Sequence, residues 1–556
     1  MQITQVLIAG AGPVGLTLAA DLASRGIECC LVEPLVDVHP HPRAISIGVR
    51  TMEHYRRLGL DQRTIEAGVP RTHKLDVVYV TRVLGRELYR FEIPSIADLE
   101  TDRAALAQRV PEIAASPYYK TWTAQAPLER MLRAHVMGLS QVHMRVGWRL
   151  DGFMERESAV AATLVECASG RTESIKTNFL VGCDGANSAV RAILKIPLEG
   201  RGTLGQAAGI YFRAPELAAK LMGGGGVMHW VLAPGCGGVI YTINGGDEWC
   251  FNRYFGVGEN CAVTDPAGLV RAAVGTDIPI EILSVQNWLP RQLVAKRYGS
   301  PRCFLAGDAC HLFVPTGGFG MNTGIGDAVD LAWKMEAVLK GWGGPGLLAS
   351  YEAERRPIGL RNTIEAADNY DRSGEIFAVP AAFEEADPAG DAARAAVMSK
   401  LPPKIKHFAP IGVHLGNAYE NSPIILADGT PAPPFEAANY KPTTRPGHRA
   451  PHVWIREGKS TLDLFGRGFT MLRFDQAVDV SALATAARAA GVPLAVHDID
   501  DPMAAQLYER KLVLVRPDGH VAWRGDEAPG KDHDTGNSLV TARALIDRVR
   551  GALWRD

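Results

Sequence analysis

The feature that constrains the fold most is a glycine-rich turn near the start of the chain. An apolar run at 5–9 leads into Gly10-Ala11-Gly12-Pro13-Val14-Gly15, and a helical pattern follows as far as Ser24. A second apolar run, 28–33, ends in an acidic residue, Glu33. Short runs of this kind are typical of strands buried on both faces of a parallel sheet. The first forty residues therefore predict a strand–helix–strand unit and an α/β fold.

The spacing of the three glycines predicts a dinucleotide site. They allow a tight turn, a close approach of backbone to a pyrophosphate, and close contact between helix and strand. The helix N-terminus offers free N–H groups to the phosphates, and Glu33 can accept hydrogen bonds from both ribose hydroxyls. An acid there disfavours a 2′-phosphate, and hence NADP in this slot. A glycine-rich turn without a ligand is the alternative, but the complete order of strand, turn, helix, strand and acid favours the nucleotide.

Two later segments indicate which dinucleotide is bound. An apolar strand at 179–182 leads to Asp184-Gly185 and a helix start with Ser188 and Arg191. A second strand, 302–306, ends in Gly307-Asp308, where a carboxylate can bind a ribityl hydroxyl of a flavin. A glycine-rich loop, 315–322, then leads into a helix predicted over 325–339, whose N-terminus would stabilise negative charge on a reduced flavin. Its candidate cofactor residues are Gly318, Gly320, Met321 and Asn322.

Taken together, the three segments resemble the signatures of single-component FAD-dependent aromatic hydroxylases of the p-hydroxybenzoate hydroxylase type. The resemblance implies a Rossmann-like FAD-binding domain with an inserted β-sheet substrate domain. Arg43 resembles the family's arginine near the flavin and adenosine phosphates, and Gln125 a residue that binds the ribityl or phosphate region. The Asp184 segment is linked in this family to both FAD and NAD(P)H. Since no other glycine-rich turn lies in such a strand–helix–strand context, NADPH or NADH is expected as a transient reductant.

The domain organisation follows from the same resemblance. We expect a monooxygenase domain over 1–400, with flavin-binding parts at about 1–75, 105–195 and 290–370 and substrate-binding insertions at about 76–104 and 196–289. A linker is predicted at 401–440. Residues 441–556 resemble the thioredoxin-like C-terminal domain of the phenol-hydroxylase branch and contain a hairpin with a Pro517-Asp518-Gly519 turn. No cysteine lies beyond Cys310, so a structural or oligomer-contact role is expected, and a homodimer is compatible with it.

The chemistry implied by the resemblance is hydroxylation of a phenolic ring by O₂ and NAD(P)H through a hydroperoxide at flavin C4a. Pro315 resembles a family proline whose carbonyl faces the phenol. His229, Tyr241 and Arg213 lie on predicted strands of the inserted sheet and are candidates to polarise or deprotonate a hydroxyl. Each of these three also fits an ordinary sheet residue. The glycine run 222–227 predicts a mobile wall beside the pocket.

Other functions remain open on the same scaffold. These are Baeyer–Villiger or other oxygenation of a polyketide-like ring, an FAD dehydrogenase or reductase without oxygen insertion, and a flavin-binding protein without catalysis. The residues do not identify the aromatic substrate.

The composition of the chain excludes several other classes of protein. The formal net charge of −2 argues against nucleic-acid binding, which needs an excess of positive charge. No apolar stretch reaches the length of a membrane span. The nine cysteines form no CxxC motif, which favours a reducing, cytoplasmic location. The histidines lack metal-ligand spacing, so no metal is expected.

Overall fold

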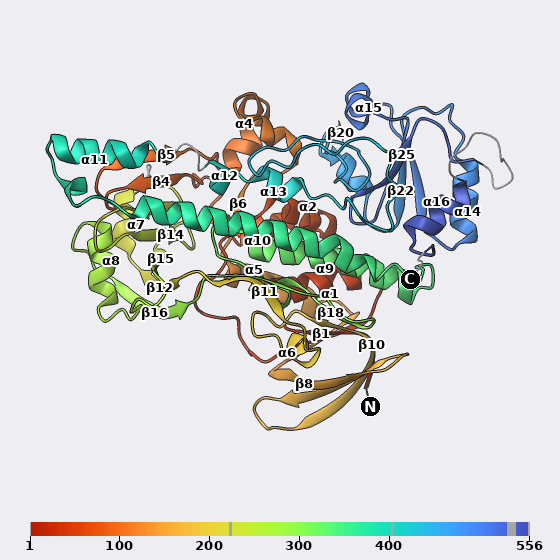
Figure 1. Cartoon of the computed structure of the whole chain (residues 1–556), viewed down its shortest axis with the longest axis horizontal. Coiled ribbons are helices and arrows are strands. Elements are labelled where there is room, and N and C mark those ends of the chain that lie inside the picture. Colours follow the sequence, from red (N-terminus) through yellow and green to blue (C-terminus); the bar gives the residue numbers. More distant parts are fainter. Residues whose placement is uncertain (1, 222–224, 402–404, 531–540, 554–556) are drawn as a thin grey trace.

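The computed structural model describes residues 2–221, 225–401, 405–530 and 541–553 (Figure 1). Part of the glycine run predicted to be mobile, 222–224, lies outside these ranges. The described chain forms a central flavin-type sheet, an inserted sheet at one end and a C-terminal unit at the other (Figure 1).

The first sheet has seven strands, with β18 paired to β10 beside the order β7-β2-β1-β10-β9-β8. Strands β1, β2, β7, β10 and β18 run parallel, and β9 and β8 continue the sheet as an antiparallel hairpin. The bounds are β1 (Gln2–Ala9), β2 (Cys29–Glu33), β7 (Val142–Val146), β8 (Trp148–Glu155), β9 (Val160–Glu166), β10 (Thr172–Gly182) and β18 (Cys303–Leu305). The strand–helix–strand prediction for the first forty residues is thus confirmed.

Three helices pack in this part of the molecule. Helix α1 (Pro13–Ser24) connects β1 to β2 and contacts both α5 (Gln125–Met137) and α9 (Phe319–Leu339). The apolar side chains of these helices and of the central strands form one buried cluster. Burial of these apolar side chains is the main favourable contribution to the folding free energy of the flavin-type domain.

The inserted sheet also has seven strands, in the order β16-β12-β15-β14-β13-β4-β5. The bounds are β4 (Val77–Val80), β5 (Glu87–Phe91), β12 (Gln206–Arg213), β13 (Met228–Val231), β14 (Gly238–Thr242), β15 (Glu248–Phe255) and β16 (Glu281–Trp288). One face, rich in aromatic side chains, packs with Trp122 and Phe408 of the rest of the domain. The opposite face packs against α7 (Pro215–Leu221) and α8 (Pro266–Val274).

The remaining elements of this domain link the two sheets. The short strands are β3 (Ser46–Ile47), β6 (Thr121–Trp122), β11 (Leu198–Thr203), β17 (Arg291–Ala295) and β19 (His311–Leu312). The helices are α2 (Val49–Leu58), α3 (Asp61–Glu66), α4 (Ile96–Arg109), η1 (Pro111–Ala115), α6 (Ala189–Ile193), η2 (Gly307–Ala309), α10 (Ser350–Phe377), η3 (Ala381–Glu384), α11 (Pro388–Met398), α12 (Ile405–Phe408) and α13 (Ile411–Leu415). Helix α10 runs along most of the molecule beside α9 (Figure 1). The stretch predicted as a linker, 401–440, includes α12 and α13.

The C-terminal unit is a four-stranded sheet with the order β23-β22-β24-β25. Its elements are β20 (Trp454–Arg456), β21 (Lys459–Ser460), η5 (Thr461–Leu464), β22 (Phe469–Arg473), α14 (Ser481–Ala489), β23 (Leu494–Asp498), α15 (Pro502–Tyr508), β24 (Leu512–Val515), β25 (Val521–Gly525) and α16 (Ala542–Val549). Strands β22 and β23 are parallel and the other pairs antiparallel, which is the arrangement of a thioredoxin-like sheet. The predicted hairpin is confirmed as β24–β25.

This unit is continuous with the flavin-type domain. Its apolar cluster includes Trp333 of α9 together with Trp342 and Leu347. Two buried ion-pair groups join the same parts. Arg516 binds Glu354 and Asp330 across the boundary, and Arg449 binds Glu53 of α2. The C-terminal unit therefore stabilises the helices that carry the cofactor segments.

Because of the Glu53–Arg449 pair, we expect the folded protein to lose stability in acid. Arg449, Arg50 and Ser116 donate hydrogen bonds to the Glu53 carboxylate. Although burial by itself raises the pKa of Glu53, the two arginines outweigh it and lower the pKa from 4.5 to about 2. This contribution to stability, roughly 3 kcal/mol, is complete above pH 4.5 and is lost as the pH falls towards 2.

We expect Glu53→Gln to be less stable than the wild type at pH 7 and to lose less stability between pH 5 and pH 3. Urea unfolding at each pH measures both effects. Glu100→Gln, in an exposed pair with Arg71, is the control and should keep the wild-type pH dependence. An unchanged pH dependence for Glu53→Gln would show that the pair contributes no acid sensitivity.

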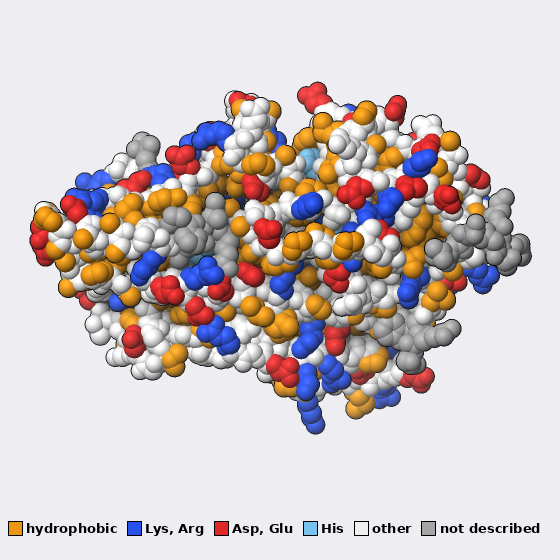
Figure 2. Space-filling view, turned by 45° about the horizontal axis from the view of Figure 1, so that its top comes forward, with side chains coloured by type: hydrophobic (Ala, Val, Ile, Leu, Met, Phe, Trp, Pro, Cys, Tyr) orange, Lys and Arg blue, Asp and Glu red, His pale blue; other side chains and the backbone are white. Residues whose placement is uncertain are grey.

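Acidic and basic side chains are interspersed on the face shown in Figure 2, without a continuous basic area among the described residues. Within the described ranges, no helix combines the length and the apolar composition that crossing a bilayer requires.

Candidate active site

The three predicted cofactor segments meet at one edge of the first sheet. Strand β10 lies between β1 and β18, with Gly182 opposite both Ala9 and Leu305. Because these strands are parallel, the turns that follow them emerge side by side. Segments about 170 and 120 residues apart in sequence thus form a single site.

The first turn has the close contacts that its glycines predict. Gly10 has φ +101°, and a Cβ added to it would lie 2.4 Å from the carbonyl oxygen of Cys183. A Cβ on Gly15 would lie 2.0 Å from the carbonyl oxygen of Gly10. At Gly12 an added Cβ would meet no heavy atom within 4 Å. The turn is therefore closed towards the protein at Gly10 and Gly15 and open at Gly12.

The open side of this turn suits a phosphate group. Gly12 is the N-cap of α1, with no side-chain cap and with Pro13 at the first helical position. Glu33 lies next to the turn at the end of β2, where its carboxylate accepts hydrogen bonds from the N–H groups of Ala11 (2.7 Å) and Leu35 (3.0 Å). Val14 packs against Gly307, so the first turn also contacts the third segment.

Arg43 and Gln125 are brought together beside the site. The Gln125 backbone N–H donates to the Ala44 carbonyl (2.7 Å), and the Ala44 N–H donates to Gln125 Oε1 (3.2 Å). The Arg43 side chain is exposed, and its positive charge opposes the pKa increase of Asp308. Arg43 is therefore open to a ligand, whereas the Gln125 amide is used within the protein, since its Nε2 also donates to Glu129 (2.6 Å).

The second segment has one unsatisfied polar atom. Asp184 Oδ2 accepts a hydrogen bond from the Val190 N–H, whereas its buried Oδ1 has no hydrogen-bond partner among the described residues. The predicted helix start is confirmed as α6, capped by the Ser188 hydroxyl. Arg191 donates to the carbonyl of Ala309 (2.8 Å), which ties this turn to the third one.

Asp308, in the third turn, is the exposed residue of this segment. Its side chain is accessible to solvent, yet desolvation by the surrounding protein raises the pKa of its carboxyl, with His311 and Arg43 opposing the increase. A carboxylate in this setting can accept hydrogen bonds from the hydroxyls of a bound ligand.

The glycine-rich loop is shorter than predicted. Helix α9 begins at Phe319, six positions before the predicted start at 325, with Gly318 (φ +69°) as its N-cap. Gly320, Met321 and Asn322 are therefore in the first turn of the helix. Gly324, within α9, is required by packing, because a Cβ there would lie 2.8 Å from Gly307 Cα.

Two residues of this region use their polar groups within the protein. The Pro315 carbonyl accepts a hydrogen bond from the Gly318 N–H (3.0 Å). The Asn322 side chain accepts from the Gly48 N–H and the Thr51 hydroxyl and donates to the carbonyls of Ser46 and Gly318. Asn322 thus fixes the loop to β3 and α2, and its side-chain polar atoms are used within the protein.

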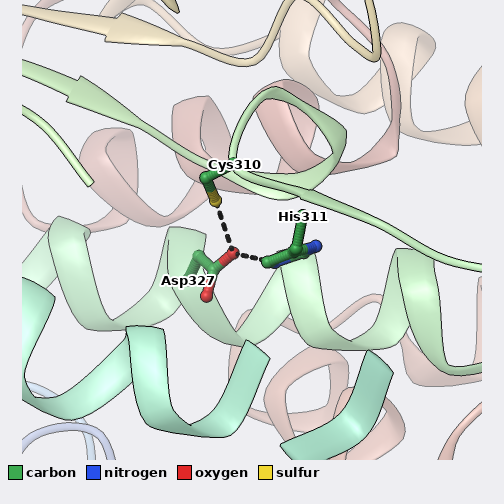
Figure 3. Close-up of side chains that lie close together, drawn as sticks. All are labelled: Cys310, His311 and Asp327. Carbon is green, nitrogen blue, oxygen red and sulfur yellow. Dashed lines mark hydrogen bonds and ion pairs between the residues drawn. The ribbon is translucent and has the colours of Figure 1, made fainter. Parts of the chain in front are cut away.

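A buried group that sequence reasoning missed holds the third turn in place (Figure 3). Asp327 of α9 accepts hydrogen bonds from the Gly307 N–H (3.1 Å) and from Arg355 Nε (2.8 Å), and its Oδ2 lies 2.7 Å from His311 Nε2. Cys310 is also near. The potential metal-ligand atoms of Cys310, His311 and Asp327 all lie within 4.8 Å of one another. Arg355 binds the same carboxylate, and a guanidinium there opposes a cation. We interpret the group as the support of the Gly307–Asp308 turn.

The three inserted-sheet candidates differ in where they point. His229 pairs with Ile240 and Val78, whose side chains belong to the face covered by α7 and α8. Side chains alternate along a strand, so His229 faces away from the cofactor segments. Burial, with Arg90 nearby, also lowers its pKa to about 4. The sheet thus does not bring His229 to the site.

The side chains of Tyr241 and Arg213 have different surroundings. Tyr241 lies on the aromatic face, buried, where its hydroxyl accepts a hydrogen bond from Asn252 (3.3 Å). Arg213, the last residue of β12, is partly exposed and forms ion pairs with Glu281 and Glu248 on the two neighbouring strands. Arg213 lies two positions after Tyr211, which packs on the aromatic face, so Arg213 points to the same side of the sheet as Tyr241 but at the end of its strand.

Two hollows adjoin the first turn of α9. One, of about 390 Å³, lies between the cofactor loop and the aromatic face and is lined by Gly317, Tyr119, Lys120, Phe408 and His414, among others. The other, of about 500 Å³, is more polar and reaches Asp518 and His520 of the C-terminal unit. The first has the position expected of a substrate pocket, and neither could be inferred from the sequence.

Comparison with known proteins agrees with this geometry. Residues 3–366 match the family model described as FAD binding domain, and residues 443–545 match the model described as aromatic-ring hydroxylase, C-terminal. Tetracenomycin B2 monooxygenase-dioxygenase of Streptomyces olivaceus is 33% identical over 94% of this chain and 95% of that protein. 2,4-Dichlorophenol 6-monooxygenase of Delftia acidovorans is 29% identical over 98% of both.

A solved structure of the rebeccamycin biosynthetic enzyme RebC with reduced flavin is also similar. It shares 38% identity and a TM-score of 0.88 over 99% of each chain. The residues on this chain fit an FAD: the turn is open at Gly12, the buried Asp184 Oδ1 atom has no partner among the described residues, and the Asp308 carboxyl is accessible.

Proposed function

Since the chain belongs to the family of FAD-binding aromatic-ring hydroxylases, we propose that it uses NAD(P)H and O₂ to hydroxylate a phenolic or polyketide-like aromatic substrate. The chain is an FAD-dependent monooxygenase with the fold of that family. The observation that carries the proposal is the convergence of the Gly10–Gly15, Asp184 and Asp308 turns at one sheet edge. When bound, FAD supplies the chemistry, accepting two electrons from the reductant and activating O₂.

The protein's own residues hold and orient the cofactor. The N–H groups at the start of α1 would bind the pyrophosphate, and Glu33 would accept hydrogen bonds from the adenosine ribose. Asp308 would bind the ribityl chain, and Arg43 would balance the phosphate charge. The uncapped start of α9 at Gly318 offers N–H groups that would stabilise negative charge on the pyrimidine end of the isoalloxazine.

The substrate would lie in the 390 Å³ pocket beside Gly317. Phe408, which lines this pocket, packs against the aromatic face of the inserted sheet, so one wall is apolar and excludes water. The names of the relatives support an aromatic substrate, since one acts on 2,4-dichlorophenol and another on tetracenomycin B2. Tyr241 remains a candidate to orient the substrate from that face.

The purified, FAD-loaded enzyme tests the proposal. We expect one or more compounds from a panel of phenols and hydroxynaphthalenes to accelerate the oxidation of NADPH or NADH severalfold, and the product formed under ¹⁸O₂ to gain one labelled oxygen. A labelled ester or lactone would instead indicate Baeyer–Villiger oxygenation. Reductant oxidation that leaves every compound unlabelled would indicate a reductase and contradict the proposal.

A further inference from the structure

Lys120 places a positive charge in the pocket between the cofactor loop and the aromatic face. It directly precedes β6, which pairs with β3, and this ladder brings it beside Ser46 and Gly48. Gly48 in turn donates a hydrogen bond to Asn322 in the first turn of α9. Lys120 and Gly317 line the same hollow. Its ammonium is thus held next to the loop that would contact the flavin.

The ammonium has spare hydrogen-bonding capacity. Nζ donates to the carbonyl of Phe408 at 3.1 Å, which uses one of its three N–H groups. No carboxylate of the described residues pairs with it, and the residues that line the pocket include no Asp or Glu. Lys120 is half-buried, and a charge partly removed from water without a counterion is costly, so such a group is normally paired. The pocket thus offers this ammonium to an anionic ligand.

The neighbouring titratable groups do not supply that anion. His414 lines the same pocket, where burial, together with the charge of Lys120, lowers its pKa to about 4, so it is neutral at pH 7. Burial raises the pKa of Tyr119 to about 12, so its phenol is also neutral. Burial lowers the pKa of Lys120 itself to about 8, which leaves it mostly protonated at pH 7.

We propose that Lys120 anchors an oxyanion carried by the aromatic substrate, so that the enzyme selects ring compounds with a carboxylate or an ionised phenol. The inference rests on the proposed function, because it assigns the pocket to the substrate. A charged hydrogen bond in a site screened from water distinguishes an acid from its neutral amide by roughly 10- to 100-fold in affinity. Lys120 would therefore be a specificity-determining residue of this pocket.

Binding to the FAD-loaded enzyme without reductant tests the proposal. The probes are 3-hydroxy-2-naphthoate and its neutral amide, 3-hydroxy-2-naphthamide, and the dissociation constants come from changes in flavin absorbance. We expect the wild type to bind the acid at least tenfold more tightly than the amide. Lys120→Met should abolish the preference without weakening the amide, and Lys120→Arg should retain most of it. Lys296→Met, at an exposed lysine, is the control.

A third probe, 2-naphthol, distinguishes the two sources of the oxyanion. If Lys120 binds a phenolate, the long-wavelength absorbance of ionised naphthol should appear on binding at pH 8 in the wild type and be absent in Lys120→Met. A preference for the acid without this signal assigns the site to a carboxylate.

Three results would overturn the proposal: equal binding of acid and amide by the wild type, an unchanged preference in Lys120→Met, or equal weakening of both probes in that variant. Failure of the proposed function is a separate outcome, since it would appear as absent oxygenation while the binding preference persisted.

Discussion

Gly12→Ala is expected to lower the affinity for FAD at least 100-fold, about 2.8 kcal/mol, while leaving the apoprotein folded. The new methyl group would meet no protein atom within 4 Å, and Gly12 has an ordinary extended backbone. Any large effect must therefore come from the ligand. The methyl group would keep the pyrophosphate away from the N–H groups of α1, and a hydrogen bond to a charged group contributes roughly 1.5–3 kcal/mol.

Titration of the apoprotein with FAD gives the dissociation constant. Thermal unfolding of the apoprotein, measured in parallel, shows whether the variant remains folded. The unfolding free energy of the apoprotein should change by less than about 1 kcal/mol. Gly374→Ala is the matched control, because it also adds a methyl group in open space, on α10. It should bind FAD normally. Wild-type FAD affinity in Gly12→Ala would refute the pyrophosphate site.

Arg516→Met is expected to destabilise the protein by roughly 3–5 kcal/mol, because breaking a buried ion pair leaves charges without compensation. The side chain of Arg516 is fully buried and binds Glu354, Asp330 and Asp518. Without it, Lys334 would be the only cation of the described part of the chain that is bonded to the two acids on α9 and α10. Asp330 and Glu354 would then share one ammonium, and Asp518 would lose its arginine.

Urea unfolding followed by tryptophan fluorescence measures this effect, since the Arg516 guanidinium lies 5.1 Å from the ring centre of Trp333. Arg510→Met, in an exposed pair with Asp526 of the same unit, is the control and should cost less than about 1 kcal/mol. If the two variants unfold at the same urea concentration, the buried network does not join the C-terminal unit to the flavin-type domain.

Local requirements made much of the cofactor site predictable. The turn at Gly10 and Gly15 tolerates only glycine because a carbonyl oxygen occupies the space of a side chain, and that requirement is visible in the spacing of three residues. The strands before Asp184 and Asp308 are short apolar runs ended by polar turns, so their ends could be predicted as well. Each of these features depends on neighbours within a few positions.

Features that depend on distant partners were decided by the tertiary structure. Gly324 of helix α9 packs on Gly307 of another segment, and His229 points away because of its register in the inserted sheet. Lys120 and Arg516 look like ordinary surface cations in the sequence, and only folding shows that one is unpaired in a pocket and the other bonded to three buried acids. The chain sequence by itself determined the turns and strands that bind a nucleotide, since these follow from local steric and apolar patterns. Which charges are buried, and what they face, depends on contacts between residues hundreds of positions apart.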